Sequence, residues 1–219
     1  MLGRHCCSPW ASDVMLDTAE LQRERALATA DVDDVRRVAV QAHDLGVSRA
    51  AQWCGKDLLE CLGHAGVVVS SHKCSPDWSV SGVEIAAYTT RDASGHVCLI
   101  DLFEDVIERK VQGLAAFGVD ASMDLVKDLH LAHEFYHYLE FSQLGLTCDS
   151  IDAVQVRGLF GRKPHHPSRA GEVAAHAFAR ACIGFPFHPV LIDVMSRMGA
   201  QGADFPVLID DFVSRMERI

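Results

Sequence analysis

The stretch that decides the fold runs from Ser122 to Gly145 and reads SMDLVKDLHLAHEFYHYLEFSQLG. Asp120 or Ser122 can cap the start of a helix, because their side chains accept hydrogen bonds from free backbone N–H groups. Gly145 can end the helix, since glycine readily adopts a left-handed backbone. The centre of the stretch, residues 133–137, reads HEFYH and matches the pattern H-E-x-x-H. We therefore predict one long helix over residues 122–144 that carries the functional motif.

The two histidines of this motif are placed to bind one metal ion. Residues four apart on an α-helix lie about 40° apart around its axis, so His133 and His137 project from one face, one turn apart. That spacing lets two imidazole nitrogens reach one Zn²⁺ at about 2.0–2.1 Å. Glu134 is rotated by about 100° from His133, beside the metal but off the ligand stripe. The pattern predicts a zinc site with Glu134 as the catalytic base.

A catalytic zinc site needs a third protein ligand and one open position. The motif helix does not supply this ligand, because Glu140 and Gln143 stand where a longer zinc motif requires Gly and His. Glu172 is our candidate, near the start of an otherwise apolar helix predicted from Ser168 to about Ile183. An isolated buried carboxylate is costly, and a metal is a partner that justifies it. The alternative is a first-turn Glu that the helix dipole favours.

Taken together, these residues resemble the ImmA/IrrE family of zinc metallopeptidases. The resemblance runs from about Ala65 to Pro186: a small sheet, the H-E-x-x-H helix and, 35 residues further on, Glu172 in an E-x-x-A-x-x-F-A helix. It implies a zincin-like fold in which His133, His137 and Glu172 bind zinc and Glu134 is the base. It also implies a cytoplasmic endopeptidase that often acts on a transcriptional repressor.

Two features depart from the usual pattern of that family. His176 stands four residues after Glu172, where the family usually has Asn. An additional helix, predicted from Leu102 to Phe117, separates the last strand from the motif helix. Because His176 shares a helix face with Glu172, we predict a catalytic role for it. It would either hold Glu172 in place or stabilise the oxyanion that forms on the substrate.

Other polar residues near the motif have more than one predicted role. His130 shares the stripe of the motif histidines and could support a ligand, contact substrate, compete for the metal or simply lie at the cleft edge. Glu140 could orient His137 through its second ring nitrogen or point into solvent. Tyr136 and Tyr138 are expected in the core. The loop residues that could cover the cleft or be exposed are His165, His166 and Arg169.

The rest of the chain predicts an α+β, helix-rich protein with a small central sheet. Residues 15–63 have helical spacing, and Gly46 is expected to end the first of two helical segments. The expected strands are Val67–Val69, Val83–Tyr88, Val97–Leu102 and a short Val154–Leu159, and the last helices are Pro189–Met198 and Phe205–Arg218. We divide the chain into a helical region, residues 1–64, packed on a metallopeptidase-like domain, residues 65–219.

Composition limits the classes of function. The chain of 219 residues has 20 Lys and Arg against 30 Asp and Glu, a net charge of -10, which disfavours nucleic acid as a partner. No uncharged stretch is long enough for a transmembrane helix, and Met1–Ser12 lacks the apolar core of a signal peptide. We therefore expect a cytoplasmic protein without a membrane partner. The 8 cysteines include no C-x-x-C pair and are expected to be buried small hydrophobic residues.

A DNA-binding regulator is the main alternative function. Residues 38–55 have the residue pattern of a helix-turn-helix with Leu45–Ser48 as the turn. Such a DNA-binding motif could precede a zinc-binding sensor or non-proteolytic domain. The charge argues against DNA binding, because residues 1–62 hold 7 Lys and Arg against 10 Asp and Glu.

Two further alternatives fit the sequence less well. A di-iron bundle needs a second E-x-x-H, which the sequence lacks. An inactive zinc scaffold would be expected to lose Glu134 first. We predict a zinc-dependent metallo-endopeptidase that hydrolyses a protein or peptide substrate.

Overall fold

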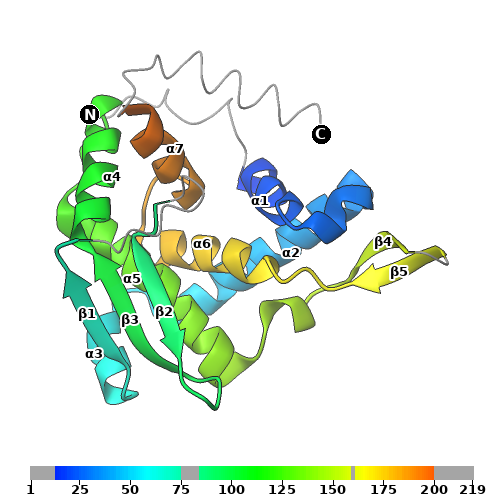
Figure 1. Cartoon of the computed structure of the whole chain (residues 1–219), viewed down its shortest axis with the longest axis horizontal. Helices are drawn as coiled ribbons and strands as arrows, with labels where there is room; N and C mark the ends of the chain where they lie inside the picture. Colours follow the sequence, from blue (N-terminus) through cyan, green and yellow to red (C-terminus); the bar gives the residue numbers. More distant parts are fainter. Residues whose placement is uncertain (1–12, 75–83, 159–160, 200–219) are drawn as a thin grey trace.

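The structure, a computed structural model, describes residues 13–74, 84–158 and 161–199 (Figure 1). It is α+β, as predicted, with helices around a small mixed sheet. The helices are α1 (Asp13–Gln22), α2 (Val32–Ala50), α3 (Leu58–His64), α4 (Glu104–Ala116), α5 (Met123–Leu139), α6 (Ala170–Ile183) and α7 (Pro189–Gly199). The strands are β1 (Val68–His72), β2 (Ala87–Arg91), β3 (Val97–Phe103), β4 (Val154–Gly158) and β5 (Gly161–His165). The predicted helix Phe205–Arg218 lies outside the described residues. Within the described ranges, every helix is too short or too polar to cross a membrane.

The motif helix forms where the sequence predicts it. α5 begins after Ser122, whose side chain accepts a hydrogen bond from the backbone N–H of Leu125 at 3.1 Å. The regular helix ends at Leu139 and continues as a π-helical turn over Glu140–Leu144. Gly145 follows with a φ of 77°, a left-handed backbone that glycine adopts without strain. The predicted span is confirmed, with a wider last turn.

A three-stranded sheet lies beside α5 in the order β1-β3-β2 (Figure 1). β3 pairs in parallel with β1 and antiparallel with β2, so β2 is an edge strand among the described residues. The prediction of Val83–Tyr88 for this strand is wrong at both ends, although Val83 itself is not described. β2 begins later and extends through the β-branched Thr89 and Thr90, because these residues pair with β3.

Two hydrophobic cores hold the helices and strands together. The larger core lies between the sheet, α5 and α6, and includes the fully buried side chains of Ile100, Leu102, Phe135, Tyr136 and Phe178. The smaller core joins α1, α2, β4 and the start of α6 through Leu21, Val35, Val38, Val154 and Val173. Tyr136 and Tyr138 are both buried, which confirms their predicted packing role. The phenol of Tyr136 accepts a hydrogen bond from Arg49 at 2.7 Å.

α2 is one continuous helix, which contradicts two predictions. Gly46 does not end the helix and Leu45–Ser48 is not a turn, because both lie inside Val32–Ala50. Gly46 instead allows α2 to approach α6 closely, since a Cβ there would lie 2.2 Å from the carbonyl oxygen of Ala174. The helix-turn-helix on which the DNA-binding hypothesis relied is therefore not formed at this position.

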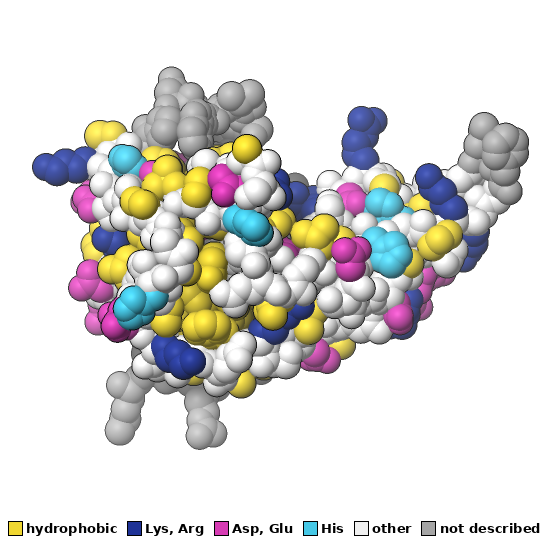
Figure 2. All heavy atoms as spheres, turned by 90° about the horizontal axis from the view of Figure 1, so that it is seen from below, with side chains coloured by type: hydrophobic (Ala, Val, Ile, Leu, Met, Phe, Trp, Pro, Cys, Tyr) yellow, Lys and Arg dark blue, Asp and Glu magenta, His cyan; other side chains and the backbone are white. Residues whose placement is uncertain are grey.

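β4 belongs to a hairpin that the sequence did not predict. A short strand was expected at β4, but β5 also forms and pairs with it antiparallel, extending away from the helices (Figure 1). β5 was not predicted because Gly161 and Pro164, which lie within it, are poor strand formers. Lys and Arg side chains are visible at this end of the molecule (Figure 2). The exposed basic residues of the hairpin are Arg157, Arg162 and Lys163.

Two local predictions are wrong. Ser168 does not cap α6, because its hydroxyl donates to the carboxylate of Glu24 at 3.1 Å and the helix begins two residues later. The cysteines are not buried: of the six that the structure describes, Cys54 and Cys74 are exposed and four are partly buried, all as free thiols. Cys54, for example, lies in the turn that follows α2, at the surface.

The close approach of α2 and α6 can be tested by adding one methyl group. Gly46→Ala places a Cβ against the backbone of Ala174, which cannot move away as a side chain could. We expect a loss of about 2–4 kcal/mol in the free energy of unfolding. Gly63→Ala is the matched control, because it is also helical and has nothing within 4 Å of the added Cβ. It should change stability by less than about 1 kcal/mol. Urea titration followed by circular dichroism measures both, and equal stability of the two variants would contradict the packing.

Candidate metal centre

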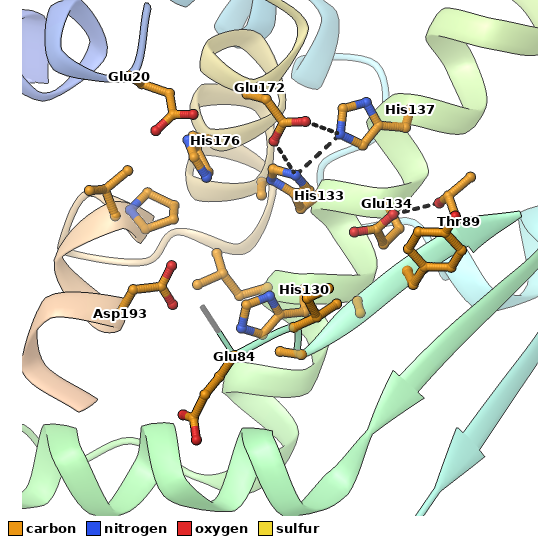
Figure 3. Close-up of a pocket in the computed structure, with 18 of the residues that line it drawn as sticks. Glu20, Glu84, Thr89, His130, His133, Glu134, His137, Glu172, His176 and Asp193 are labelled. Carbon is orange, nitrogen blue, oxygen red and sulfur yellow. Dashed lines mark hydrogen bonds and ion pairs between the residues drawn. The ribbon is translucent and has the colours of Figure 1, made fainter. Parts of the chain in front are cut away.

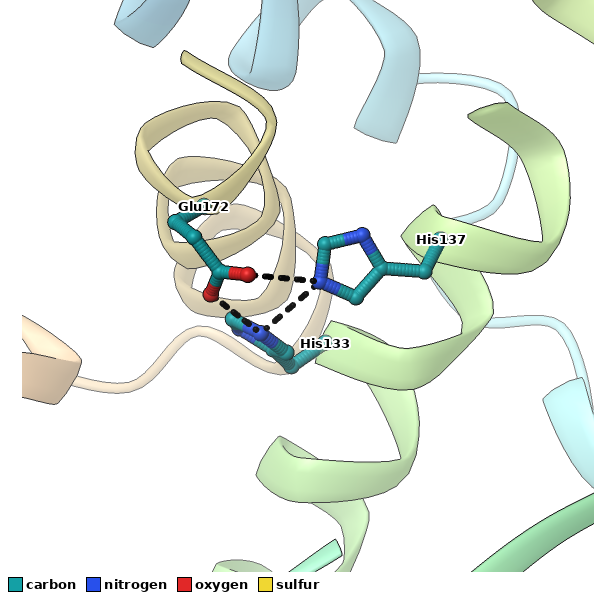
Figure 4. Close-up of side chains that lie close together, drawn as sticks. All are labelled: His133, His137 and Glu172. Atoms are coloured by element: carbon teal, nitrogen blue, oxygen red, sulfur yellow. Dashed lines mark hydrogen bonds and ion pairs between the residues drawn. The ribbon is translucent and has the colours of Figure 1, made fainter. Parts of the chain in front are cut away.

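α5 and α6 present the predicted ligands to each other. The two helices pack together, with the rings of Phe135 and Phe178 stacked at a centroid distance of 6.1 Å. This packing places His133 and His137 on α5 opposite Glu172 in the first turn of α6 (Figure 4). All three residues predicted as metal ligands are thereby brought together.

The donor atoms of the three residues, two imidazole nitrogens and the two oxygens of one carboxylate, are spaced as ligands of one metal ion. Nε2 of His133 lies 3.2 Å from Nε2 of His137 and 3.4 Å from Oε2 of Glu172. Nε2 of His137 lies 3.6 Å from Oε1 of Glu172. Ligands about 2.0–2.1 Å from a tetrahedral Zn²⁺ are about 3.3–3.4 Å from one another. Within the described residues, this is the one group of three His, Cys, Asp or Glu side chains that could hold a metal, and it is compatible with zinc.

A buried carboxylate holds His137 from the side opposite the cluster. Glu140 is 5% exposed and accepts hydrogen bonds from Nδ1 of His137 at 3.3 Å and from the backbone N–H of Thr147 at 2.7 Å. Gly171 leaves room for this carboxylate, since a Cβ there would lie 2.8 Å from its oxygen. The prediction that Glu140 points into solvent is wrong. The alternative, that it orients His137, is supported by the contact with Nδ1. With Nδ1 bonded to Glu140, Nε2 of His137 faces the cluster.

Glu134 lies beside the ligand pair, at the position expected of a base. Its side chain lines the pocket next to His133 and points towards β2, where the hydroxyl of Thr89 donates to Oε2 at 2.5 Å (Figure 3). Among the described residues, Thr89 is its one hydrogen-bond partner. The edge strand therefore fixes one carboxylate oxygen of Glu134 and leaves Oε1 available.

Without metal, the surrounding carboxylates raise the pKa of His137. Burial lowers the pKa of this imidazole, but the hydrogen bond with Glu140 and the charges of Glu172 and Glu134 outweigh burial and raise it to about 9. Burial raises the pKa of Glu172, but its interactions with His133 and His137 outweigh that effect and hold it well below its usual range. The cluster therefore holds positive charge at neutral pH, as a proton or as a metal cation.

The cluster opens into a pocket of about 480 Å³ between β2, α5, α6 and α7 (Figure 3). The three candidate ligands and Glu134 line one end of it, and Glu84 and Asp193 line the other. The side chain of Glu172 is 39% exposed at the pocket wall. Glu172 is therefore only partly buried, not fully buried as expected from the sequence, because the pocket gives this residue access to solvent. The same opening leaves one side of the candidate ligand cluster accessible from the pocket.

His176 packs against the cluster. The centroid of its ring lies 4.8 Å from that of His133 and 5.5 Å from that of His188. Its Nδ1 is buried without a hydrogen-bond partner, and no hydrogen bond to Glu172 forms, so the proposed support of that ligand is not made. Burial and the neighbouring histidines lower its pKa well below the usual range, which keeps the ring neutral. Since His176 lines the pocket, its catalytic role stays a prediction.

The loop residues between the ligand helices are divided between the surface and the pocket. His165 pairs with Glu24, and Nδ1 of His166 donates to a backbone carbonyl at 2.9 Å, so neither lines the pocket. Arg169 does line it, and its guanidinium pairs with the buried carboxylate of Glu20. Of the three residues that could cover the cleft, only Arg169 lies at the pocket.

Three residues that reach the site from other elements were not predicted from the sequence. Thr89 on β2 holds Glu134, while Lys110 on α4 and Asp193 on α7 form a pair beside His130. A threonine in an alternating strand or a lysine in an amphipathic helix gives no local sign of such a role. Lys110 is unusual only in the folded chain, where its side chain is 4% exposed.

Zinc binding is expected to release a proton. His137 must be neutral to bind a metal, whereas its pKa of about 9 keeps it protonated at neutral pH in the metal-free protein. Lowering the pH strengthens the competing proton and weakens zinc binding, and above about pH 9 the effect disappears. At pH 7 we expect about one proton released per zinc. Calorimetric titrations in two buffers of different ionisation enthalpy count these protons, and a count of zero would contradict the charge state assigned to His137.

Comparisons with known proteins assign no family to the chain. No family model, no curated protein and no solved structure matches it. The resemblance to ImmA/IrrE metallopeptidases therefore rests on the motif residues alone and stays a prediction. Any assignment of function depends on the geometry of His133, Glu134, His137 and Glu172.

Proposed function

We propose that the chain is a zinc-dependent metallo-endopeptidase with a zincin-like arrangement of its active site. The observation that carries the proposal is the cluster of His133, His137 and Glu172, whose donor atoms make contacts of 3.2–3.6 Å and which opens into a pocket beside the carboxylate of Glu134. A structural zinc site is closed by four protein ligands, whereas a catalytic site keeps an open position. Three ligands at a pocket wall favour the catalytic type.

The residues of the chain divide the chemistry among them. Zinc held by His133, His137 and Glu172 would polarise a peptide carbonyl and lower the pKa of water towards neutrality. Glu134 accepts the proton of the attacking water on Oε1, because Oε2 is held by Thr89, and then protonates the leaving amine nitrogen. Neutral His176 would donate from Nε2 to the oxyanion that develops on the substrate, since its Nδ1 is buried.

The position of β2 supports a peptide as the substrate. Among the described strands, β2 lies at the edge of its sheet, and its residues from Ala87 to Thr89 line the pocket beside Glu134. An extended peptide can add to a sheet edge through backbone hydrogen bonds, which do not require a particular sequence. The scissile bond of such a peptide would then lie between the strand and the ligand cluster.

The metal content of the purified chain tests the site. We expect about one zinc per chain after loading and desalting, and its loss in His133→Ala and Glu172→Ala, because two ligands cannot hold the ion tightly. His166→Ala is the control, since this histidine lies outside the pocket and should leave the stoichiometry unchanged. Mass spectrometry of the bound metal gives the count. A wild-type chain that retains no metal would contradict the proposal.

The role of Glu134 can be separated from metal binding. Glu134→Gln keeps the shape and the contact with Thr89 but cannot accept a proton, so zinc content should be unchanged. The rate of cleavage of fluorescently labelled casein should fall by about 10²–10⁴-fold. His166→Ala again serves as control and should cleave at the wild-type rate. If Glu134→Gln cleaves casein as fast as the wild type, the assigned base is wrong.

A further inference from the structure

A second polar cluster lies at the end of the pocket away from the candidate ligands. Lys110 on α4 is buried, and its ammonium donates to Oδ1 of Asp193 on α7 at 2.5 Å. The same nitrogen lies 3.2 Å from Nε2 of His130 on α5. Three helices thus converge on one buried lysine. The cluster is distinct from the metal centre, but His130 and Asp193 both line the same pocket.

The contact with Lys110 fixes where the proton of His130 lies. A lysine ammonium has three N–H donors and no acceptor, so Nε2 of His130 must be the acceptor in this contact. An imidazole with an accepting Nε2 is neutral and carries its hydrogen on Nδ1. Burial and the charge of Lys110 also lower the pKa of His130 well below its usual range, which agrees with the neutral form.

The remaining ring nitrogen of His130 is available to a ligand. Nδ1 has no hydrogen-bond partner among the described residues. Nδ1 of His130 is also not sealed in the interior. Among the described residues, the buried side-chain nitrogen and oxygen atoms without a partner are Nε1 of Trp53 and Nδ1 of His176, and Nδ1 of His130 is not one of them. The ring lines the pocket on the side of His133 that faces Glu84 (Figure 3). A donor of fixed direction therefore faces the space where a substrate would bind.

We propose that His130, held by Lys110 as the Nδ1–H tautomer, donates a hydrogen bond from Nδ1 to a carbonyl oxygen of a bound peptide. The assignment rests on the proposed function, since it names a contact to that substrate. His130 lies one turn before His133 on the same face of α5, so the carbonyl it binds belongs to a residue near the scissile bond. Lys110 is a positioning residue that acts through His130, and Asp193 holds Lys110 in place.

The tautomer can be measured without any substrate. Side-chain nitrogen NMR of the full chain labelled with ¹⁵N-histidine distinguishes Nδ1–H from Nε2–H, and His130→Gln identifies the signal of His130 by its absence. We expect Nδ1–H in the wild type, both with and without zinc. Lys110→Met removes the donor to Nε2 and should shift the ring towards Nε2–H. An Nε2–H ring in the wild type, or no shift in Lys110→Met, would overturn the assignment.

The contact with a peptide can be tested with two amides that differ in position. The side-chain nitrogen of Asn lies near the place of histidine Nδ1, whereas that of Gln lies near Nε2. The probe is a peptidyl hydroxamate, titrated by calorimetry into the zinc-loaded chain. His130→Asn should bind it within about threefold of the wild type, and His130→Gln about 5–20-fold more weakly, for the loss of one hydrogen bond.

Acetohydroxamate separates this contact from the metal centre. It carries the same metal-binding group but no further peptide carbonyl, so both variants should bind it as the wild type does. Equal binding of the peptidyl hydroxamate by wild type and His130→Gln would overturn the contact while leaving the proposed function intact. Failure of the wild type to bind either hydroxamate would contradict the proposed function and overturn the contact with it. The tautomer measurement is independent of both results.

Discussion

The packing of α6 against both α2 and α5 determines where the candidate ligands lie. On one side, Gly46 of α2 lies beneath the carbonyl of Ala174, closer than any side chain would allow. On the other side, Phe178 stacks on Phe135 of α5. These two contacts fix the position and rotation of α6 relative to α2 and α5. They thereby place the carboxylate of Glu172 opposite the motif histidines. The ligand set is therefore a property of the three-helix contact as much as of the motif.

Glu140 links this packing to the charge of the site. A buried carboxylate needs hydrogen-bond donors, and it finds them in His137 and the backbone N–H of Thr147. It also needs space, which Gly171 at the start of α6 provides. The same carboxylate helps to raise the pKa of His137, so the side chain that orients the ligand also increases the attraction of the site for a cation. Orientation and electrostatics come from one group.

Features set by local spacing were predictable, and features set by distant contacts were not. The i, i+4 histidines of α5, its Ser122 cap and its end near Gly145 depend on residues within a few turns, and all three predictions are confirmed. Gly46 was misinterpreted because a glycine that ends a helix and one that admits a neighbouring helix look alike in sequence. Thr89 was missed since its partner lies 45 residues away on another element. Glu172 was identified from the apolar helix that carries it, although the carboxylate itself is only partly buried.

His130 and His137 lie on the same face of α5 and line the same pocket, but the charges around them have opposite sign. His137 is surrounded by Glu140, Glu172 and Glu134, which favour a cation on the ring or beside it. His130, two turns earlier, contacts the ammonium of Lys110, which occupies its Nε2 and repels positive charge. A metal ion at Nε2 of His130 would have to displace that ammonium, and one at Nδ1 would have to displace the ring hydrogen and lie near the same positive charge. His130 is therefore a poor competitor for the metal, and an ion is favoured at the end of the pocket where His133, His137 and Glu172 lie.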